Sequence, residues 1–170
     1  LKLFENIDRL LMVLISFLMI IGLITLSSAS QQGIGLMTNQ LINILFGFLL
    51  LIFLSRINPK IFIFYAPHFY IISLILLVLV IFFGYESHGA KRWINFFILN
   101  LQPSEIIKIT VPLMLAGLYH RFQNKISYKI HSIAFLILAL PCAMIFKQPD
   151  LGTSILISFS GLIIIFLAGL

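Results

Sequence analysis

Charged residues are scarce in this chain of 170 residues: they make up 9% of it, and only five residues are acidic. A soluble domain carries roughly 25% charged residues, so this chain has too few to cover a water-exposed surface. Hydrophobic residues make up 61% of the chain, and the mean hydropathy is +1.16. The scarcity of charge therefore excludes a soluble globular protein and indicates an integral membrane protein.

Cysteine is almost absent as well, since Cys142 is the only one. A single cysteine excludes a disulfide within the chain and a cysteine-based metal site. The four histidines show no pair at metal-ligand spacing. The sequence also lacks a P-loop, a zinc motif and a nucleophile elbow, and Gly33 and Gly35 do not have the spacing of a nucleotide-binding fingerprint. Local motifs by themselves therefore assign no enzyme activity.

Long apolar stretches are what the chain has instead. At about 1.5 Å per helical residue, most of them are long enough to cross a hydrocarbon core of about 30 Å. A backbone in lipid must satisfy its own hydrogen bonds, which favours helices, and no alternating polar pattern supports a barrel. We therefore predict an all-α integral membrane protein, a bundle of six transmembrane helices in a single transmembrane domain over residues 1–170. The predicted helices are residues 10–29, 38–55, 62–84, 104–120, 130–146 and 151–169.

Basic residues are distributed unequally between the two sides of this predicted bundle. If the N-terminus is cytoplasmic, the inner loops hold seven Lys and Arg residues and the outer loops hold three, with Lys108 inside a helix. The positive-inside rule then places both the N-terminus and the C-terminus in the cytoplasm. The net charge of +6 is scattered over short loops rather than along a stripe, which argues against nucleic acid as a partner. The inner residues are Lys2, Arg9, Arg56, Lys60, Arg121, Lys125 and Lys129, and the outer ones are Lys91, Arg92 and Lys147.

Three polar segments interrupt the apolar chain, all on the predicted outer side. Ionisable groups in or against the hydrocarbon are costly, which makes these segments the candidates for function. They are residues 89–93 (GAKRW), 102–108 (QPSEIIK) and 147–154 (KQPDLGTS).

The first segment places two cations beside the only tryptophan. Lys91 and Arg92 offer donors to the oxygens of a lipid phosphate or diphosphate, with Trp93 at head-group depth. The alternative is an interfacial anchor, in which the two basic side chains extend to the head groups and Trp93 lies in the aromatic belt.

The second segment begins the fourth predicted helix. Pro103 suits the first helical position, and Glu105 follows in the first turn, where the helix dipole favours an anion. Lys108 lies three residues later on the same face, so we expect an ion pair with Glu105. This pair is either structural or part of a polar cavity in which Lys108 neutralises an anionic ligand.

The third segment places Asp150 immediately before the sixth predicted helix, with Gln148 at the same helix mouth. Asp150 is either an N-cap that accepts backbone N–H bonds, or a carboxylate that orients a sugar hydroxyl or holds a divalent ion beside a diphosphate. Small residues that suit close helix packing follow on one face of this helix: Ser154, Ser158 and Gly161.

Taken in order, these segments resemble the SEDS family (shape, elongation, division and sporulation), and the resemblance runs over the whole length. It implies a bacterial inner-membrane peptidoglycan glycosyltransferase that polymerises lipid II, the undecaprenyl diphosphate-linked disaccharide-pentapeptide, on the outer face during cell elongation and shape control. It also implies a class B penicillin-binding protein as partner, and a ten-helix fold of which this chain is the N-terminal half. The resemblance is carried by residues 27–30 (SSAS), 89–94 (GAKRWI), 102–108, 111–114 (VPLM) and 148–154 (QPDLGTS).

The resemblance implies supporting rather than catalytic roles for the polar residues of this chain. The aspartate that the family uses in catalysis belongs to a large outer loop after the sixth span, so we expect no catalytic residue here and no activity from the chain alone. Cations are expected to stabilise the departing diphosphate, with a divalent cation, Mg²⁺ or Mn²⁺, as the candidate cofactor. The residues carried over as substrate-binding are Lys91, Arg92, Trp93, Glu105, Lys108, Gln148 and Asp150.

Two functions of other classes are weighed against this one. A flippase or transporter for a lipid-linked sugar predicts ionisable residues at mid-depth and a repeat between the two halves, whereas Lys108 lies near the outer end and no repeat is evident. A noncatalytic membrane scaffold of the cell-wall machinery predicts that the three segments serve only as anchors, caps and one ion pair.

Overall fold

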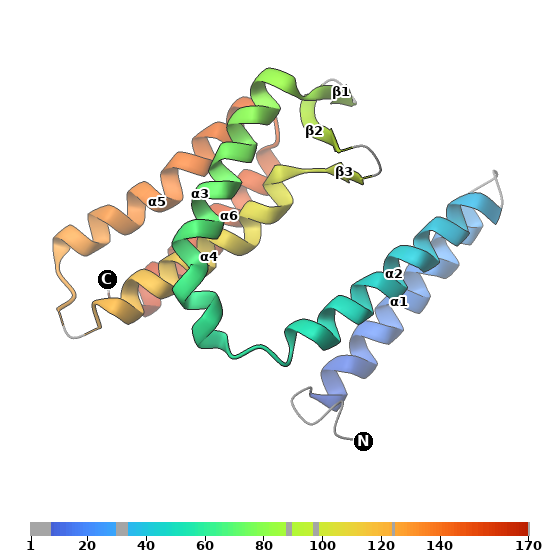
Figure 1. Ribbon diagram of the computed structural model, residues 1–170, viewed down its shortest axis with the longest axis horizontal. Coiled ribbons are helices and arrows are strands. Elements are labelled where there is room, and N and C mark those ends of the chain that lie inside the picture. Colours follow the sequence, from blue (N-terminus) through green and yellow to red (C-terminus); the bar gives the residue numbers. More distant parts are fainter. Residues whose placement is uncertain (1–7, 30–33, 88–89, 97–98, 124, 170) are drawn as a thin grey trace. The chain divides into compact units, whose positions relative to one another are not determined.

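The computed structural model describes residues 8–29, 34–87, 90–96, 99–123 and 125–169 (Figure 1). The described chain is mainly helical, and its six helices confirm the predicted all-α fold class. The second helix begins four residues earlier than predicted, at Ile34, because the apolar stretch continues through residues 34–37 and the helix tolerates Gly35 in its first turn. The helices are α1 (Arg9–Ala29), α2 (Ile34–Leu54), α3 (Pro59–Phe83), α4 (Pro103–Arg121), α5 (Tyr128–Lys147) and α6 (Leu151–Leu167).

The chain divides into two compact units, Leu1–Asn58 and Pro59–Leu170. The first unit contains α1 and α2, which contact one another, and the second contains α3 to α6. No residue in the apolar spans of α1 and α2 is buried within the protein. Helices that expose apolar side chains on every face suit a lipid environment. A single transmembrane domain over residues 1–170 stays a prediction.

Among the described residues, α1, α2, α3 and α5 are the helices long and apolar enough to cross a membrane. The apolar helix α6 is shorter, with 17 residues. Helix α4 is more polar, because it begins with Glu105 and Lys108 and ends with His120 and Arg121. It contacts α3, α5 and α6, and polar groups inside a bundle are tolerated better than polar groups facing lipid. We therefore expect α4 and α6 to span the membrane only as parts of the packed bundle.

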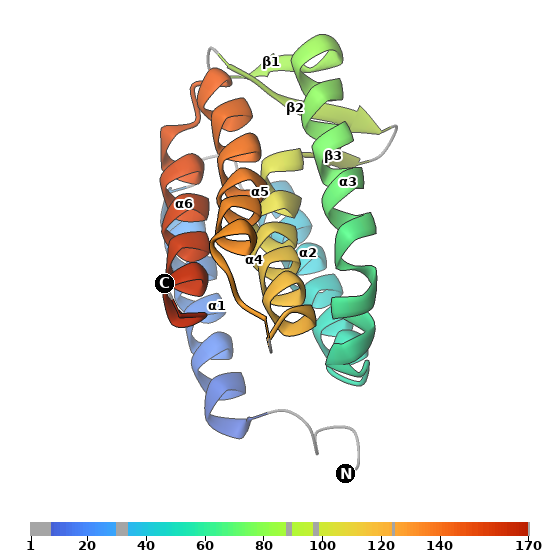
Figure 2. The same ribbon diagram turned by 90° about the vertical axis from the view of Figure 1, so that its left-hand side faces the viewer.

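The second unit is a four-helix bundle with the strands at one end (Figures 1 and 2). Ile107, Val111 and Leu115 of α4 are fully buried and recur at helical spacing, so one face of α4 forms the centre of the core. A pair of hydroxyl groups joins α3 to α4. Ser73 Oγ of α3 lies 2.9 Å from Thr110 Oγ1 of α4, which joins these two helices by a buried hydrogen bond.

Small residues bring α5 and α6 close together, as the sequence predicted. A Cβ atom added at Gly161 of α6 would lie only 2.4 Å from Leu138 Cδ1 of α5. Ser154 Oγ donates a hydrogen bond to the Cys142 carbonyl at 3.3 Å, and Ser158 Oγ lies 3.2 Å from Cys142 Sγ. The small-residue face of α6 is therefore a helix-packing surface.

The connection between α3 and α4, which we expected to be a loop, contains a small antiparallel sheet. Its strands pair in the order β1-β2-β3, with Tyr85 opposite Trp93 and Ile94 opposite Leu101. The loop prediction was wrong because the central strand is rich in aromatic and β-branched residues, which favour strands. The strands are β1 (Tyr85–Ser87), β2 (Ala90–Phe96) and β3 (Leu99–Leu101).

Candidate functional site

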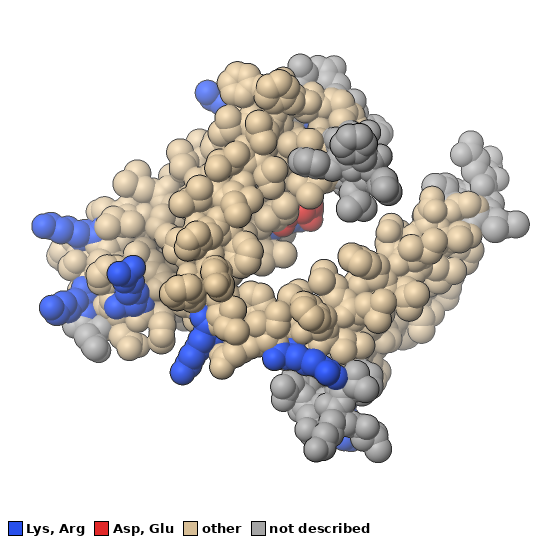
Figure 3. All heavy atoms as spheres, in the orientation of Figure 1, with Lys and Arg blue, Asp and Glu red and all other residues tan. Residues whose placement is uncertain are grey.

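The three polar segments meet at one end of the second unit, where α3 and α5 end and α4 and α6 begin. We call this the hairpin end and define it as strands β1 to β3, residues 103–108 and residues 148–153. At the opposite end, where α4 ends and α5 begins, the charged groups are basic: Arg121, Lys125 and Lys129. Figure 3 shows Lys and Arg side chains there on a face that is otherwise mostly uncharged. The carboxylates of Glu105 and Asp150 thus lie at the end of the unit opposite to these basic residues.

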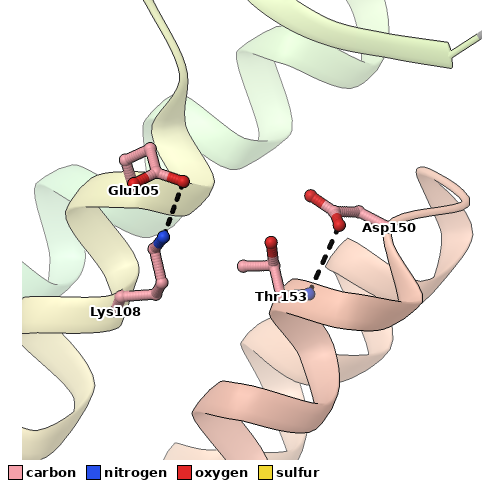
Figure 4. A network of polar contacts seen from close by, with 4 residues as sticks. All are labelled: Glu105, Lys108, Asp150 and Thr153. Atoms are coloured by element: carbon pink, nitrogen blue, oxygen red, sulfur yellow. Dashed lines mark hydrogen bonds and ion pairs between the residues drawn. The ribbon is translucent and has the colours of Figure 1, made fainter. Parts of the chain in front are cut away.

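The predicted ion pair of α4 is confirmed (Figure 4). Lys108 Nζ lies 2.7 Å from Glu105 Oε1, and the side chains of Lys108 and Glu105 are 27% and 55% exposed. An ion pair with this much exposure contributes little to stability, because water screens both charges. An anionic ligand can therefore replace Glu105 as the partner of Lys108 without a large loss of folding free energy.

Ser104, in the first turn of α4, is a polar residue that the sequence analysis missed. It is 2% exposed, and its Oγ atom makes no hydrogen bond to the residues that the structure describes. A buried hydroxyl without a partner costs about 1–3 kcal/mol. The sequence gives only a weak signal for it, since a serine after a helix-starting proline is ordinarily exposed.

Asp150 is the N-cap of α6, as one of the two interpretations predicted. Its side chain is buried, and Oδ1 accepts a hydrogen bond from the Thr153 backbone N–H at 3.3 Å. Figure 4 shows its carboxylate pointing toward α4, on the side where Glu105 and Lys108 lie, and α4 contacts α6. Capping therefore leaves Asp150 facing the ion pair of α4.

Arg92 and Gln148 hold the turn that precedes Asp150. Arg92 of β2 donates from Nε to the Gln148 carbonyl at 3.2 Å, and from Nη2 to the Pro149 carbonyl. The buried side chain of Gln148 donates from Nε2 to the Leu77 carbonyl of α3 at 3.4 Å. The turn between α5 and α6 is thus attached both to the small sheet and to α3.

Lys91 and Trp93 flank Arg92 on β2. The Cα atom of Lys91 is opposite that of Glu86 in the register, and Trp93 is partly buried. Phosphate binding and interfacial anchoring both stay predictions for these two residues. The structure gives Arg92 a third role that the sequence did not indicate, because its hydrogen bonds go to backbone carbonyls.

The carboxylates at the hairpin end are too few to hold a metal ion by themselves, and further oxygens would have to come from a bound phosphate group. Among the described residues, no group of three or more His, Cys, Asp or Glu side chains could hold a metal ion. Glu105 and Asp150 supply carboxylate oxygens, and Mg²⁺ is commonly bound by one or two carboxylates together with substrate phosphates. The residues therefore fit a Mg²⁺ or Mn²⁺ ion that is shared with a phosphate group.

The mouth offers a ligand one cation, two carboxylates and two helix N-termini. The N-termini of α4 and α6 both lie here, and each carries a partial positive charge that attracts anions. Lys108 adds a full charge beside them. This arrangement defines a helical, multi-span membrane protein with a polar mouth at one end of its second unit.

The chain belongs to the FtsW/RodA/SpoVE family of cell cycle proteins, whose model matches residues 6–170. The resemblance to the SEDS family is thereby confirmed. Peptidoglycan glycosyltransferase MrdB of Escherichia coli strain K12 is 39% identical over 165 residues, which are 97% of this chain and 45% of MrdB. The probable peptidoglycan glycosyltransferase FtsW of Aliivibrio salmonicida is 30% identical over 172 residues, covering 95% of this chain and 43% of FtsW. The chain thus spans less than half the length of these relatives.

Solved structures give the same result for the fold. The crystal structure of Thermus thermophilus rod shape determining protein RodA is similar with a TM-score of 0.85 and 27% identity, over 96% of this chain and 54% of RodA. A peptidoglycan synthase complex, described for its coordination of polymerization and crosslinking, is similar with a TM-score of 0.84 and 28% identity. That match covers 95% of this chain and 48% of the other.

Proposed function

We propose that this chain forms part of a peptidoglycan glycosyltransferase that polymerises lipid II at the outer face of the bacterial inner membrane, during cell elongation and shape control. The observation that carries the proposal is the 39% identity of nearly the whole chain to a peptidoglycan glycosyltransferase. The hairpin end supports it with suitable chemistry, because a cation and two helix N-termini gather where a lipid diphosphate would lie.

The proposed role of the hairpin end is to bind the diphosphate of lipid II and stabilise it as it leaves. A sugar hydroxyl of one lipid II attacks the anomeric carbon of another, the bond from that carbon to the diphosphate breaks, and negative charge builds up on the undecaprenyl diphosphate. Lys108 and the N-terminus of α4 interact with that charge more strongly as it develops, which lowers the barrier. Glu105 gives up its ion pair when the diphosphate arrives.

A divalent cation is the proposed cofactor. Mg²⁺ or Mn²⁺, when bound, would neutralise further charge on the diphosphate, and Glu105 and Asp150 are the residues that would hold it. The proton of the attacking hydroxyl is taken, by the family resemblance, by a carboxylate outside these 170 residues. For the same reason we propose a class B penicillin-binding protein as partner, a proposal supported by the structural likeness to a peptidoglycan synthase complex.

A chimera tests the proposed function. In E. coli MrdB, the segment that this chain matches is replaced by the chain, and the purified chimera is incubated with lipid II. We expect glycan polymer from the chimera and none from the 170 residues alone, with products separated by size on gels. A chimera that folds in the membrane but makes no polymer contradicts the proposal. Movement of labelled head groups across proteoliposomes without polymer would instead support the flippase.

A further inference from the structure

We propose that Arg92 is a positioning residue: it fixes the turn at residues 148–149 and thereby holds Asp150 toward the Glu105–Lys108 pair. The inference rests on the proposed function where it assigns Asp150 to the substrate site. The hold on the turn itself does not depend on that function. In this role the small sheet between α3 and α4 controls the geometry of the mouth without touching the reacting atoms.

The guanidinium group of Arg92 holds two successive backbone carbonyls at once. Nε and Nη2 form one edge of the planar group, and both donate to carbonyls of successive residues, Gln148 and Pro149. A rigid two-donor fork fixes the orientation of both acceptors, which a lysine ammonium cannot do. Arg92 is partly buried, and the two residues that it connects, Arg92 and Gln148, are 56 positions apart in the chain. It therefore attaches β2 to the start of α6.

Asp150 directly follows the turn that Arg92 holds. Gln148 is 6% exposed and is held on its other side by the hydrogen bond to the Leu77 carbonyl. The Asp150 N–H donates to the Ile145 carbonyl at a longer distance of 3.4 Å, so this bond alone fixes the backbone weakly. A shift of the two carbonyls held by Arg92 would therefore move the backbone that presents the Asp150 carboxylate to α4.

Positioning of Asp150 and direct binding of the diphosphate predict different effects of replacing Arg92. The two acceptors that the structure gives for Arg92 are neutral backbone carbonyls, those of Gln148 and Pro149. A residue that clamps a diphosphate directly should act independently of Asp150. A residue that acts through the turn should have little further effect on the polymerisation rate once Asp150 has been replaced.

Hydrogen exchange of this chain in lipid nanodiscs tests the hold on the turn. We expect Arg92→Ala to speed amide exchange across residues 148–153 by about tenfold or more, because two charge-assisted hydrogen bonds are lost. Lys147→Ala is the matched control, since it removes an exposed positive charge next to the same turn and should leave exchange unchanged. Unchanged exchange in Arg92→Ala overturns the proposal.

Trp93 reports whether the small sheet survives the substitution, because it is the only tryptophan and follows Arg92 on β2. If Arg92→Ala alters Trp93 emission, Arg92→Lys takes its place, because lysine keeps the charge but lacks the fork. Faster exchange at the turn with wild-type Trp93 emission supports the proposal. Wild-type exchange at the turn in Arg92→Lys overturns it.

A double-mutant cycle in the MrdB chimera tests the action through Asp150. We expect Arg92→Ala to slow lipid II polymerisation by about tenfold, and to have less than about twofold further effect in an Asp150→Asn background. Equal effects in both backgrounds overturn positioning and favour direct binding of the diphosphate. If the unsubstituted chimera makes no polymer, the proposed function fails while the exchange result still decides the role of Arg92.

Discussion

Replacing Lys108 by alanine should lower the rate of lipid II polymerisation by the MrdB chimera by about 100-fold, the effect typical of removing one group that stabilises developing charge. Two physical effects add. The substitution removes the cation at the N-terminal end of α4, and it leaves Glu105, which Lys108 contacts at 2.7 Å, as an unpaired negative charge facing the diphosphate. The loss should appear mainly in kcat, because the charge on the diphosphate increases as the bond breaks.

Lys147→Ala is the control for this substitution. Lys147 lies at the same end of the bundle, is exposed, and makes no ion pair with the residues that the structure describes. It should change the rate by less than about twofold. Near wild-type turnover in a folded Lys108→Ala chimera would mean that the α4 pair is structural only.

The second large effect concerns stability rather than activity. Gly161→Leu should destabilise the second unit by about 1–3 kcal/mol, because overpacking at a close helix contact forces side chains or backbone to shift. The added Cβ alone would lie 2.4 Å from Leu138 Cδ1. The measurement is the unfolding midpoint of the chain in detergent, followed by Trp93 fluorescence and circular dichroism.

Gly152→Leu is the matched substitution on the same helix, because a Cβ there meets no atom within 4 Å. It should leave the midpoint nearly unchanged. Leu138→Ala should restore part of the stability lost in Gly161→Leu by making room for the larger side chain. Equal midpoints for Gly161→Leu and Gly152→Leu would show that α5 and α6 do not pack through Gly161.

The helices could be predicted from the sequence because membrane spans are local features. Most are continuous apolar stretches bounded by polar residues, and even the ends of the more polar α4, Pro103–Arg121, differ by only one residue at each end from the prediction. The small sheet could not be predicted in the same way. Strands β1 and β3 have three residues each, and their stability comes from pairing with β2 rather than from any periodic pattern of their own.

The contacts of the candidate site are likewise of two kinds: local contacts, which the sequence predicts, and long-range contacts, which it does not. The Glu105–Lys108 pair and the cap at Asp150 join residues three positions apart, so helix geometry alone predicts them. The contact of Arg92 with the Gln148 carbonyl joins residues 56 positions apart, and an arginine that binds a backbone carbonyl leaves no pattern in the sequence of its acceptor. Its role is visible only in the folded structure.

Accessibility labelling tests most directly whether the hairpin end is the outer, substrate-facing end. Lys147→Cys and Lys129→Cys mark the hairpin end and the opposite end of α5, each in a Cys142→Ser background that removes the only native cysteine. A membrane-impermeant maleimide added to intact spheroplasts should label position 147 at once and position 129 only after permeabilisation. Labelling of position 129 but not 147 in intact spheroplasts would place the hairpin end in the cytoplasm and contradict the account.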